Sequence, residues 1–155
     1  MTSHSESAAE VFGLSNQDRR AIETLYRAFS DHDPSLLDQA VSPDWEDIPR
    51  APHQQPGREG MKPIIKEFIA AFPDVTVKIH EIIGVPGRAA VRAEIAGTHA
   101  GEWFGVAPTG KRFVFPIHEF HRMENGLVTH TWHLEDWLGW MNQVGAAGAA
   151  RELSR

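Results

Sequence analysis

Three stretches in the first half of the chain carry apolar residues at the three- and four-residue spacing of an amphipathic helix. The first follows Ser15, a residue type that caps helices, and its apolar positions are Ile22, Leu25, Tyr26 and Phe29. The second starts at Asp33 and Pro34 and is short. The third runs from Gly57 or Gly60 to Phe72. The pattern therefore predicts three consecutive helices.

After Phe72 the apolar residues alternate with polar ones, which is the period of a β-strand. Alternation covers residues 75–79 and 89–99, and longer strands are predicted over 113–123 and 127–135, joined by a tight turn at 124–126. A short strand is also predicted at 43–48, before a proline-rich loop. Helices followed by meandering strands predict an α+β fold in which a curved antiparallel sheet packs on the helices.

The segment from Leu127 to Gly145 concentrates three of the five tryptophans and two of the nine histidines. Its period changes from two to that of a helix at Asp136, and the helix positions are 137, 140, 141 and 144. Counting from Val128, alternation places His130, Trp132, Leu134 and Asp136 on one strand face. The apolar members of this set predict that this face points inward.

Length and composition indicate one domain, since the chain has 155 residues, 41% of them hydrophobic and 23% charged. We expect a flexible N-terminal tail over residues 1–13, a single domain over 14–145 and a C-terminal tail over 146–155. The chain has no cysteine, which excludes disulfides, thiolate metal sites and a cysteine nucleophile.

The charge pattern bears on partners and location. A formal charge of −6 with scattered basic residues argues against nucleic acid, because phosphate binding needs a clustered basic surface. The polar N-terminus and the lack of a long apolar run predict a cytoplasmic protein that does not bind membranes. A small, hydrophobic ligand is the expected partner.

A metal site is a first candidate chemistry, because histidine and carboxylate are good ligands for zinc or iron. Five histidines lie on the last three predicted strands: His99, His118, His121, His130 and His133. However, the pairs 118/121 and 130/133 are three residues apart and point to opposite strand faces. The sequence also lacks an HxH or HExxH motif. We therefore predict no metal.

General acid–base catalysis is the second candidate, because an apolar environment raises the pKa of a carboxyl group toward neutrality. Asp136, between Trp132 and Trp137, fits this description, but an aspartate just before a helix is equally well explained as an N-cap. Asp47, beside Trp45 and Ile48, is a second candidate that turn formation explains equally well. The motifs of serine hydrolases, phosphoryl transfer and dinucleotide binding are absent from the sequence.

Four motifs, read in order, resemble a known family: Ala71-Phe72-Pro73-Asp74-Val75, Gly97-Thr98-His99-Ala100-Gly101-Glu102-Trp103-Phe104-Gly105, Pro108-Thr109-Gly110-Lys111 and the closing Trp132, Asp136, Gly139 and Gln143-Val144-Gly145. They are similar to those of the SnoaL-like polyketide cyclases, also called predicted ester cyclases. This family belongs to the superfamily of nuclear transport factor two and ketosteroid isomerase. The resemblance implies a cone-shaped α+β barrel with a deep apolar cavity between sheet and helices.

The resemblance also implies a reaction and its residues. Members of the family close a ring of an aromatic polyketide by an intramolecular aldol condensation, without a cofactor, using an aspartate as acid and base and a histidine as assistant. The aspartate matches Asp136, and the histidine matches His118 or His121, of which the comparison with ketosteroid isomerase favours His118. The same comparison places Asp47 where that enzyme has its base.

We therefore expect a cofactor-independent cyclase, isomerase or lyase acting on a hydrophobic, carbonyl-containing molecule, with Asp136, His118 and Asp47 as catalytic residues. The expected substrate-binding residues are Trp45, His99, Trp103, Phe120, His130 and Trp132. One alternative is a non-catalytic small-molecule-binding module. Another is epoxide or ester hydrolysis, which would require an Asp–Arg–Asp-like cluster with Arg92 as its candidate arginine. An outer sheet face bearing Phe115 and Ile117 would favour a homodimer.

Overall fold

The computed structural model describes residues 13–148, so most of the two predicted tails, 1–13 and 146–155, lies outside the described residues. Helix α1 (Asn16–Ser30) is capped by the Ser15 hydroxyl, which accepts a hydrogen bond from the Asp18 amide at 3.0 Å. A short 3-10 turn (Pro34–Leu36) leads into α2 (Leu37–Ala40), and α3 spans Gly57–Ala71. The three predicted helices are confirmed.

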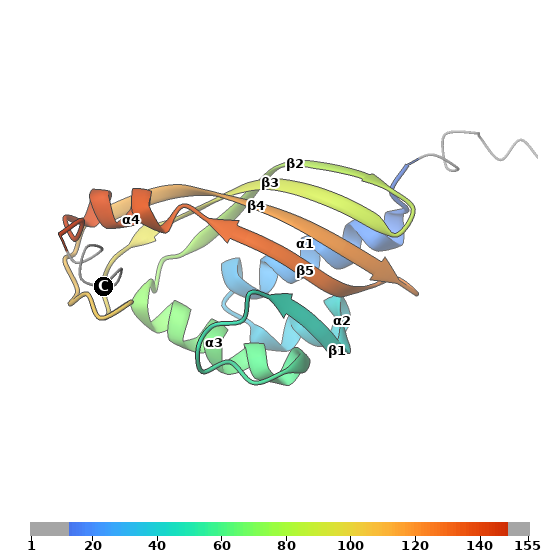
Figure 1. Ribbon diagram of the computed structural model, residues 1–155, viewed down its shortest axis with the longest axis horizontal. Helices are drawn as coiled ribbons and strands as arrows, with labels where there is room; N and C mark the ends of the chain where they lie inside the picture. The colour runs from blue at the N-terminus through green and yellow to red at the C-terminus, as the bar shows by residue number, and fades with distance from the viewer. Residues whose placement is uncertain (1–12, 149–155) are drawn as a thin grey trace, which may run out of the picture.

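Five strands form one open sheet in the order β1-β5-β4-β3-β2 (Figure 1). Their bounds are Val41–Ile48 for β1, Thr76–Val85 for β2, Arg88–Thr98 for β3, Arg112–Glu124 for β4 and Leu127–Glu135 for β5. The pairs from β2 to β5 are antiparallel, whereas β1 pairs with β5 in parallel, so the sheet is mixed. The final helix, α4, spans Trp137–Val144.

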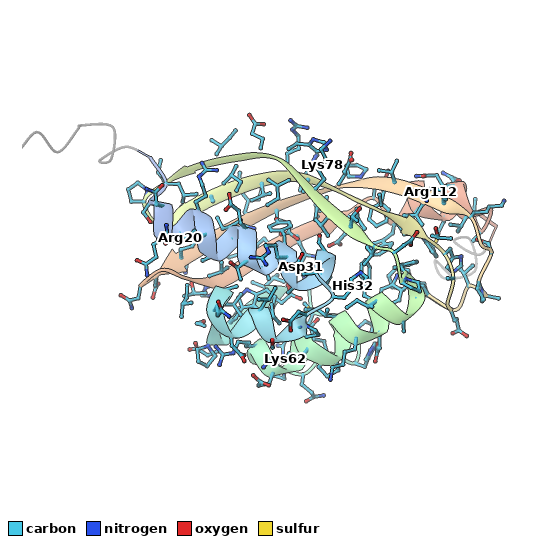
Figure 2. The ribbon with its side chains drawn as sticks, turned by 180° about the vertical axis from the view of Figure 1, so that it is seen from behind. Arg20, Asp31, His32, Lys62, Lys78 and Arg112 are labelled. Atoms are coloured by element: carbon cyan, nitrogen blue, oxygen red, sulfur yellow. The ribbon has the colours of Figure 1, made fainter. Side chains whose placement is uncertain are left out.

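Helices α1, α2 and α3 lie on one side of the curved sheet, as the ribbon shows (Figure 1), and α1, which carries Arg20, crosses the sheet when it is seen from behind (Figure 2). We call the sheet face toward these helices the inner face and the opposite one the outer face. The predicted α+β architecture, a curved sheet packed on three helices, is confirmed.

The inner face is set by the odd-numbered residues of β4. Phe113, Phe115 and Ile117 are buried, whereas Val114 and Phe120 are 48% and 63% exposed. The prediction that His118 and Phe120 point inward is therefore wrong, and so is the prediction that Phe115 and Ile117 lie on an outer dimer face. The physical reason is that the larger apolar set of this strand is the odd one, and burying it removes more apolar surface from water.

On β5 the predicted inward face is also wrong, because the strand contains a bulge. Val128 pairs with Met123, but His130 pairs with Arg122, so Thr129 is an extra residue on β5. The parity therefore reverses: Val128 is fully buried, whereas Trp132 and Leu134 are 37% and 76% exposed. After the bulge, the inner residues are Thr131, His133 and Glu135, by their register with the inner residues of β4.

Candidate active site

Polar side chains gather on the inner face of β5 and of the two strands that flank it, β4 and β1. The register pairs His121 with Thr131, Glu119 with His133 and Ile117 with Glu135, and Thr131 also faces Asp47 on β1. Tyr26 reaches this group from α1, since its hydroxyl donates a hydrogen bond to Glu119. We call these residues the inner polar group: Tyr26, Asp47, Glu119, His121, Thr131, His133 and Glu135.

His133 lies between two carboxylates. Its Nδ1 is 2.7 Å from Glu135 Oε1, and its Nε2 is 3.4 Å from Asp47 Oδ1. Burial alone would lower the pKa of His133, but the hydrogen bonds and negative charges of Asp47 and Glu135 raise it to about 11. At neutral pH this side chain is therefore an imidazolium, and it donates a hydrogen bond through each ring nitrogen.

The loop after β1 fixes Asp47. Gln54 Nε2 donates a hydrogen bond to Asp47 Oδ2 at 3.0 Å, and the Gln54 amide oxygen accepts one from the Ala51 backbone at 2.9 Å. The Pro49 carbonyl accepts a hydrogen bond from His133 Nε2 at 2.8 Å. The loop packs closely on α3, because a Cβ at Gly60 would lie 1.8 Å from the Gln55 carbonyl oxygen. Glycine at this position thus allows the loop to reach the site.

The other half of the inner polar group is a chain of hydrogen bonds deeper in the fold. His121 Nε2 is 3.3 Å from Glu119 Oε2 and 3.2 Å from the Tyr26 hydroxyl. Its Nδ1 is 2.9 Å from Thr131 Oγ1, which also accepts a hydrogen bond from Trp45 Nε1 at 3.1 Å. The buried side chains of His121, Thr131 and Trp45 in this network therefore all have hydrogen-bond partners, as burial demands.

Two pKa shifts follow from this packing. Burial would raise the pKa of Glu119, but hydrogen bonds and charge from His121, together with the Tyr26 hydroxyl, hold it below its ordinary value. Burial and the neighbouring Glu119 carboxylate raise the pKa of Tyr26 well above its ordinary value. At neutral pH Glu119 is therefore an anion and Tyr26 a neutral donor.

Asp136 and His118, two predicted catalytic residues, lie elsewhere. Asp136 is exposed, and its Oδ1 accepts a hydrogen bond from the Gly139 amide at 2.8 Å, so it caps α4. His118 is exposed on the outer face and pairs across the sheet with Leu134. The expected apolar pocket around Asp136 is therefore not found. The third predicted catalytic residue, Asp47, is buried in the inner polar group.

Three predicted substrate-binding residues lie on the outer face: Phe120, His130 and Trp132. His130 and Trp132 stack with ring centroids 5.6 Å apart, and Arg122 lies 5.7 Å from the centre of the Trp132 ring. An open hollow of about 630 Å³ on this face is lined by Ile83, Phe120, Trp132 and Leu134 among others. Arg92, the arginine considered for hydrolysis, is also exposed here, with its Nε 3.5 Å from Glu81.

The remaining predicted binding residues, Trp45, His99 and Trp103, are inside the fold. Trp45 contacts the inner polar group through Thr131. His99 is fully buried, with Nδ1 3.0 Å from the Thr109 hydroxyl, and burial lowers its pKa. Trp103 packs on Phe68 and Phe72, with centroids 5.3 and 5.6 Å away. His99 and Trp103 therefore belong to an aromatic cluster rather than to the inner polar group.

Sequence reasoning missed Tyr26, Glu119, Thr131, His133 and Glu135 as site residues. Glu119 and His121 share the parity of Phe115 and Ile117, so the larger apolar set on that strand was the available signal. The positions of His133 and Glu135 depend on the bulge at Thr129, which carries no glycine or other local sign in the sequence.

Over residues 13–148, no group of three or more histidine, aspartate and glutamate side chains has an arrangement that could hold a metal ion. No helix in the same part of the chain is long and apolar enough to cross a membrane.

A curved mixed sheet on three helices, with an acid–histidine group on its inner face, defines an α+β cone fold with an interior candidate site. The family model of the SnoaL-like polyketide cyclases matches residues 19–144, so the chain belongs to this family. The predicted family is thus confirmed. No curated protein matches the chain significantly.

Solved structures share the fold. TsrD from Streptomyces laurentii is 25% identical with a TM-score of 0.78, over 84% of this chain and 96% of TsrD. IdmH from Streptomyces antibioticus, provisionally named a polyketide cyclase, is 28% identical with a TM-score of 0.72, over 84% and 99%. AclR from Streptomyces galilaeus, provisionally named a hydroxylase, is 24% identical with a TM-score of 0.70, over 83% and 96%.

Proposed function

We propose that this protein is a cofactor-independent acid/base enzyme that removes a proton from carbon in a hydrophobic, carbonyl-containing small molecule, with aldol-type ring closure as the leading reaction. The observation that carries the proposal is the state of Glu135. Its Oε1 is bound by the His133 imidazolium at 2.7 Å, and no hydrogen bond within residues 13–148 engages its Oε2. Glu135 is thus an oriented carboxylate with a free oxygen.

His133 and Asp47 support this base. The His133 imidazolium fixes the Glu135 carboxylate by donating a hydrogen bond from Nδ1 to Oε1. Asp47 Oδ1 lies 3.4 Å from the other ring nitrogen, Nε2, and orients the ring. The Glu135 and His133 side chains are each 18% exposed, so the pair is screened from most solvent without being closed off. In this proposal Glu135 takes up the proton and later returns it, because the reaction needs an acid after it has used a base.

The side chains of Asp136 and His118, which the sequence predicts to be catalytic, are both on the exterior. A reaction that used them would have to take place in the open, where water screens charges and competes for hydrogen bonds. In our proposal Glu135 is therefore the acid and base, and Asp47 is a positioning residue that acts through His133. Trp45, through Thr131, supports the same group.

Hydrolysis is a second candidate, favoured by one observation. The arrangement of Asp47, His133 and Glu135 places a cation between two carboxylates, which is the charge order that the Asp–Arg–Asp requirement describes. Here the cation is histidine, and Arg92 takes no part. In such a reaction one carboxylate would activate a water molecule. Deuterium exchange in D₂O separates hydrolysis from proton abstraction, because hydrolysis does not exchange carbon-bound hydrogen.

The proposed function is tested by incubating the protein in D₂O with a panel of fused-ring ketones and following the signals of protons alpha to the carbonyl by NMR. Accelerated loss of such a signal is the expected result, since proton abstraction precedes ring closure. If ketones that bind show neither exchange nor a product, the non-catalytic binding module is the better explanation.

We also propose a homodimer that buries the outer face. Large exposed apolar residues gather there from three strands, β2, β4 and β5: Ile83, Val85, Val114, Phe120, Trp132 and Leu134. A second copy is the proposed occupant, because the same apolar surface on each copy would be self-complementary about a twofold axis. Sedimentation at micromolar concentration is expected to give a dimer, and Phe120→Asp a monomer. A monomeric wild type would contradict the proposal.

A further inference from the structure

Every hydrogen-bond donor of the inner polar group is already used within the fold. The Tyr26 hydroxyl donates to Glu119, and His133 donates to Glu135 and to the Pro49 carbonyl. Trp45 donates to Thr131, and His121 has Thr131 on one ring nitrogen and Glu119 and Tyr26 on the other. Within the inner polar group no donor is therefore left to receive an oxyanion, which ordinarily needs preorganised N–H or O–H groups.

Acceptors, in contrast, are in excess. The inner polar group holds three carboxylates, Asp47, Glu119 and Glu135, around the His133 imidazolium. Only one oxygen of Glu119 and one of Glu135 has a hydrogen-bond partner within the described residues. The Glu135 side chain is 18% exposed, and its Oε2, which has no hydrogen-bond partner among residues 13–148, is not fully enclosed. Each carboxylate oxygen accepts but cannot donate, so a ligand must supply the proton or the positive charge.

An aromatic wall adjoins Glu135. Trp137 follows it by two residues and is half-buried, and its ring packs on Phe115 with centroids 4.9 Å apart. Phe115 lies on the inner face next to Ile117, which is the cross-strand partner of Glu135. Trp137 also packs on Trp103 at 6.0 Å. Indole faces attract cations, so this wall and the carboxylate favour the same class of ligand.

We propose that the ligand of the inner polar group carries a cationic nitrogen on an apolar body: a protonated amine, an iminium or a protonated N-heterocycle. This inference rests on Glu135 acting as the base of the proposed function, and it replaces the carbonyl group of the substrate by a cationic nitrogen. In an iminium substrate, Glu135 Oε2 takes the proton from the carbon next to C=N⁺. The C–H electron pair forms a C=C bond, and the C=N π pair moves to nitrogen. The product is a neutral enamine, so no oxyanion forms.

Three probes with one naphthalene skeleton test the inference at pH 7 by isothermal titration calorimetry: 2-naphthylmethylamine, 2-naphthylmethanol and 2-naphthoate. The amine, which is protonated, is expected to bind about tenfold more tightly than the alcohol, since charge-assisted hydrogen bonds are roughly twice as strong as neutral ones. The carboxylate is expected to bind most weakly. Glu135→Gln is expected to remove the preference for the amine.

Glu124→Gln is the matched control, because Glu124 is an exposed carboxylate at the β4–β5 turn. This variant is expected to keep the full preference. Equal affinities, a preference for the carboxylate, absence of amine binding at millimolar concentration, or a preference that survives Glu135→Gln would each overturn the inference. Binding is measured without turnover. Amine selectivity without proton exchange on any substrate would refute the proposed function alone, whereas exchange without amine selectivity would refute this inference alone.

Discussion

Replacing Glu135 with glutamine is expected to lower the rate of proton abstraction by about 10²- to 10⁴-fold, the usual contribution of a positioned general base. Glutamine preserves the size of the side chain, and its amide oxygen can still accept a hydrogen bond from His133 Nδ1–H. It has no basic oxygen to take up a proton from carbon. The measurement is the deuterium exchange rate of a substrate that the wild type processes, with circular dichroism to confirm folding.

Asp136→Asn is the matched control for this experiment, since it makes the same chemical change one residue further along the chain. Asparagine caps helices about as well as aspartate, so the start of α4 is expected to remain intact. If Asp136 acts only as the cap of α4, this variant keeps wild-type exchange. A large loss of exchange in Asp136→Asn together with normal exchange in Glu135→Gln would contradict our proposal. The base would then be Asp136, as the sequence predicts.

The contrast between these neighbouring acids illustrates what the sequence could predict. The helix and strand positions followed from apolar periodicity, because that signal is spread over many residues and tolerates single errors. The inward face of β5 depended on one residue, Thr129, whose insertion exchanges the two faces of the strand. Threonine is a good strand former, so nothing at that position indicated a bulge.

Asp47 was identified from the sequence because its neighbours carried the right information. Trp45 lies on the same strand face and is buried with it, at 2% and 5% exposure. The partners of Asp47 were not predictable in the same way. Gln54 belongs to an irregular loop, and His133 reaches Asp47 through the parallel pairing of β1 with β5, which joins residues far apart in the chain. Such long-range pairings leave no local periodic pattern.

The resemblance to the family gave the correct architecture but a different set of site residues. Family motifs such as Gly97-Thr98-His99 correspond here to structural features, since His99 is enclosed in the aromatic cluster with Phe72 and Trp140. Asp136, in the closing motif, caps a helix. A motif that specifies a fold can therefore be satisfied by packing and capping alone. In our proposal the chemistry rests on other residues, Glu135 above all.

His133→Gln is expected to destabilise the folded protein by about 3–5 kcal/mol at neutral pH, because it leaves the buried Asp47 and the partly buried Glu135 without their cation. The effect has a defined pH dependence. The pKa of His133 rises from 6.5 to about 11 on folding, so its contribution is complete below pH 6.5 and is lost as the pH rises toward 11. Urea unfolding between pH 6 and 10.5 should therefore show that the free energy of unfolding of the wild type falls toward that of the variant as the pH rises.

His53→Gln is the control, since His53 pairs with Glu67 at a site where its side chain is 62% exposed. Its curve is expected to follow the wild type, and a His133→Gln curve parallel to the wild type would show that His133 is not the buried cation.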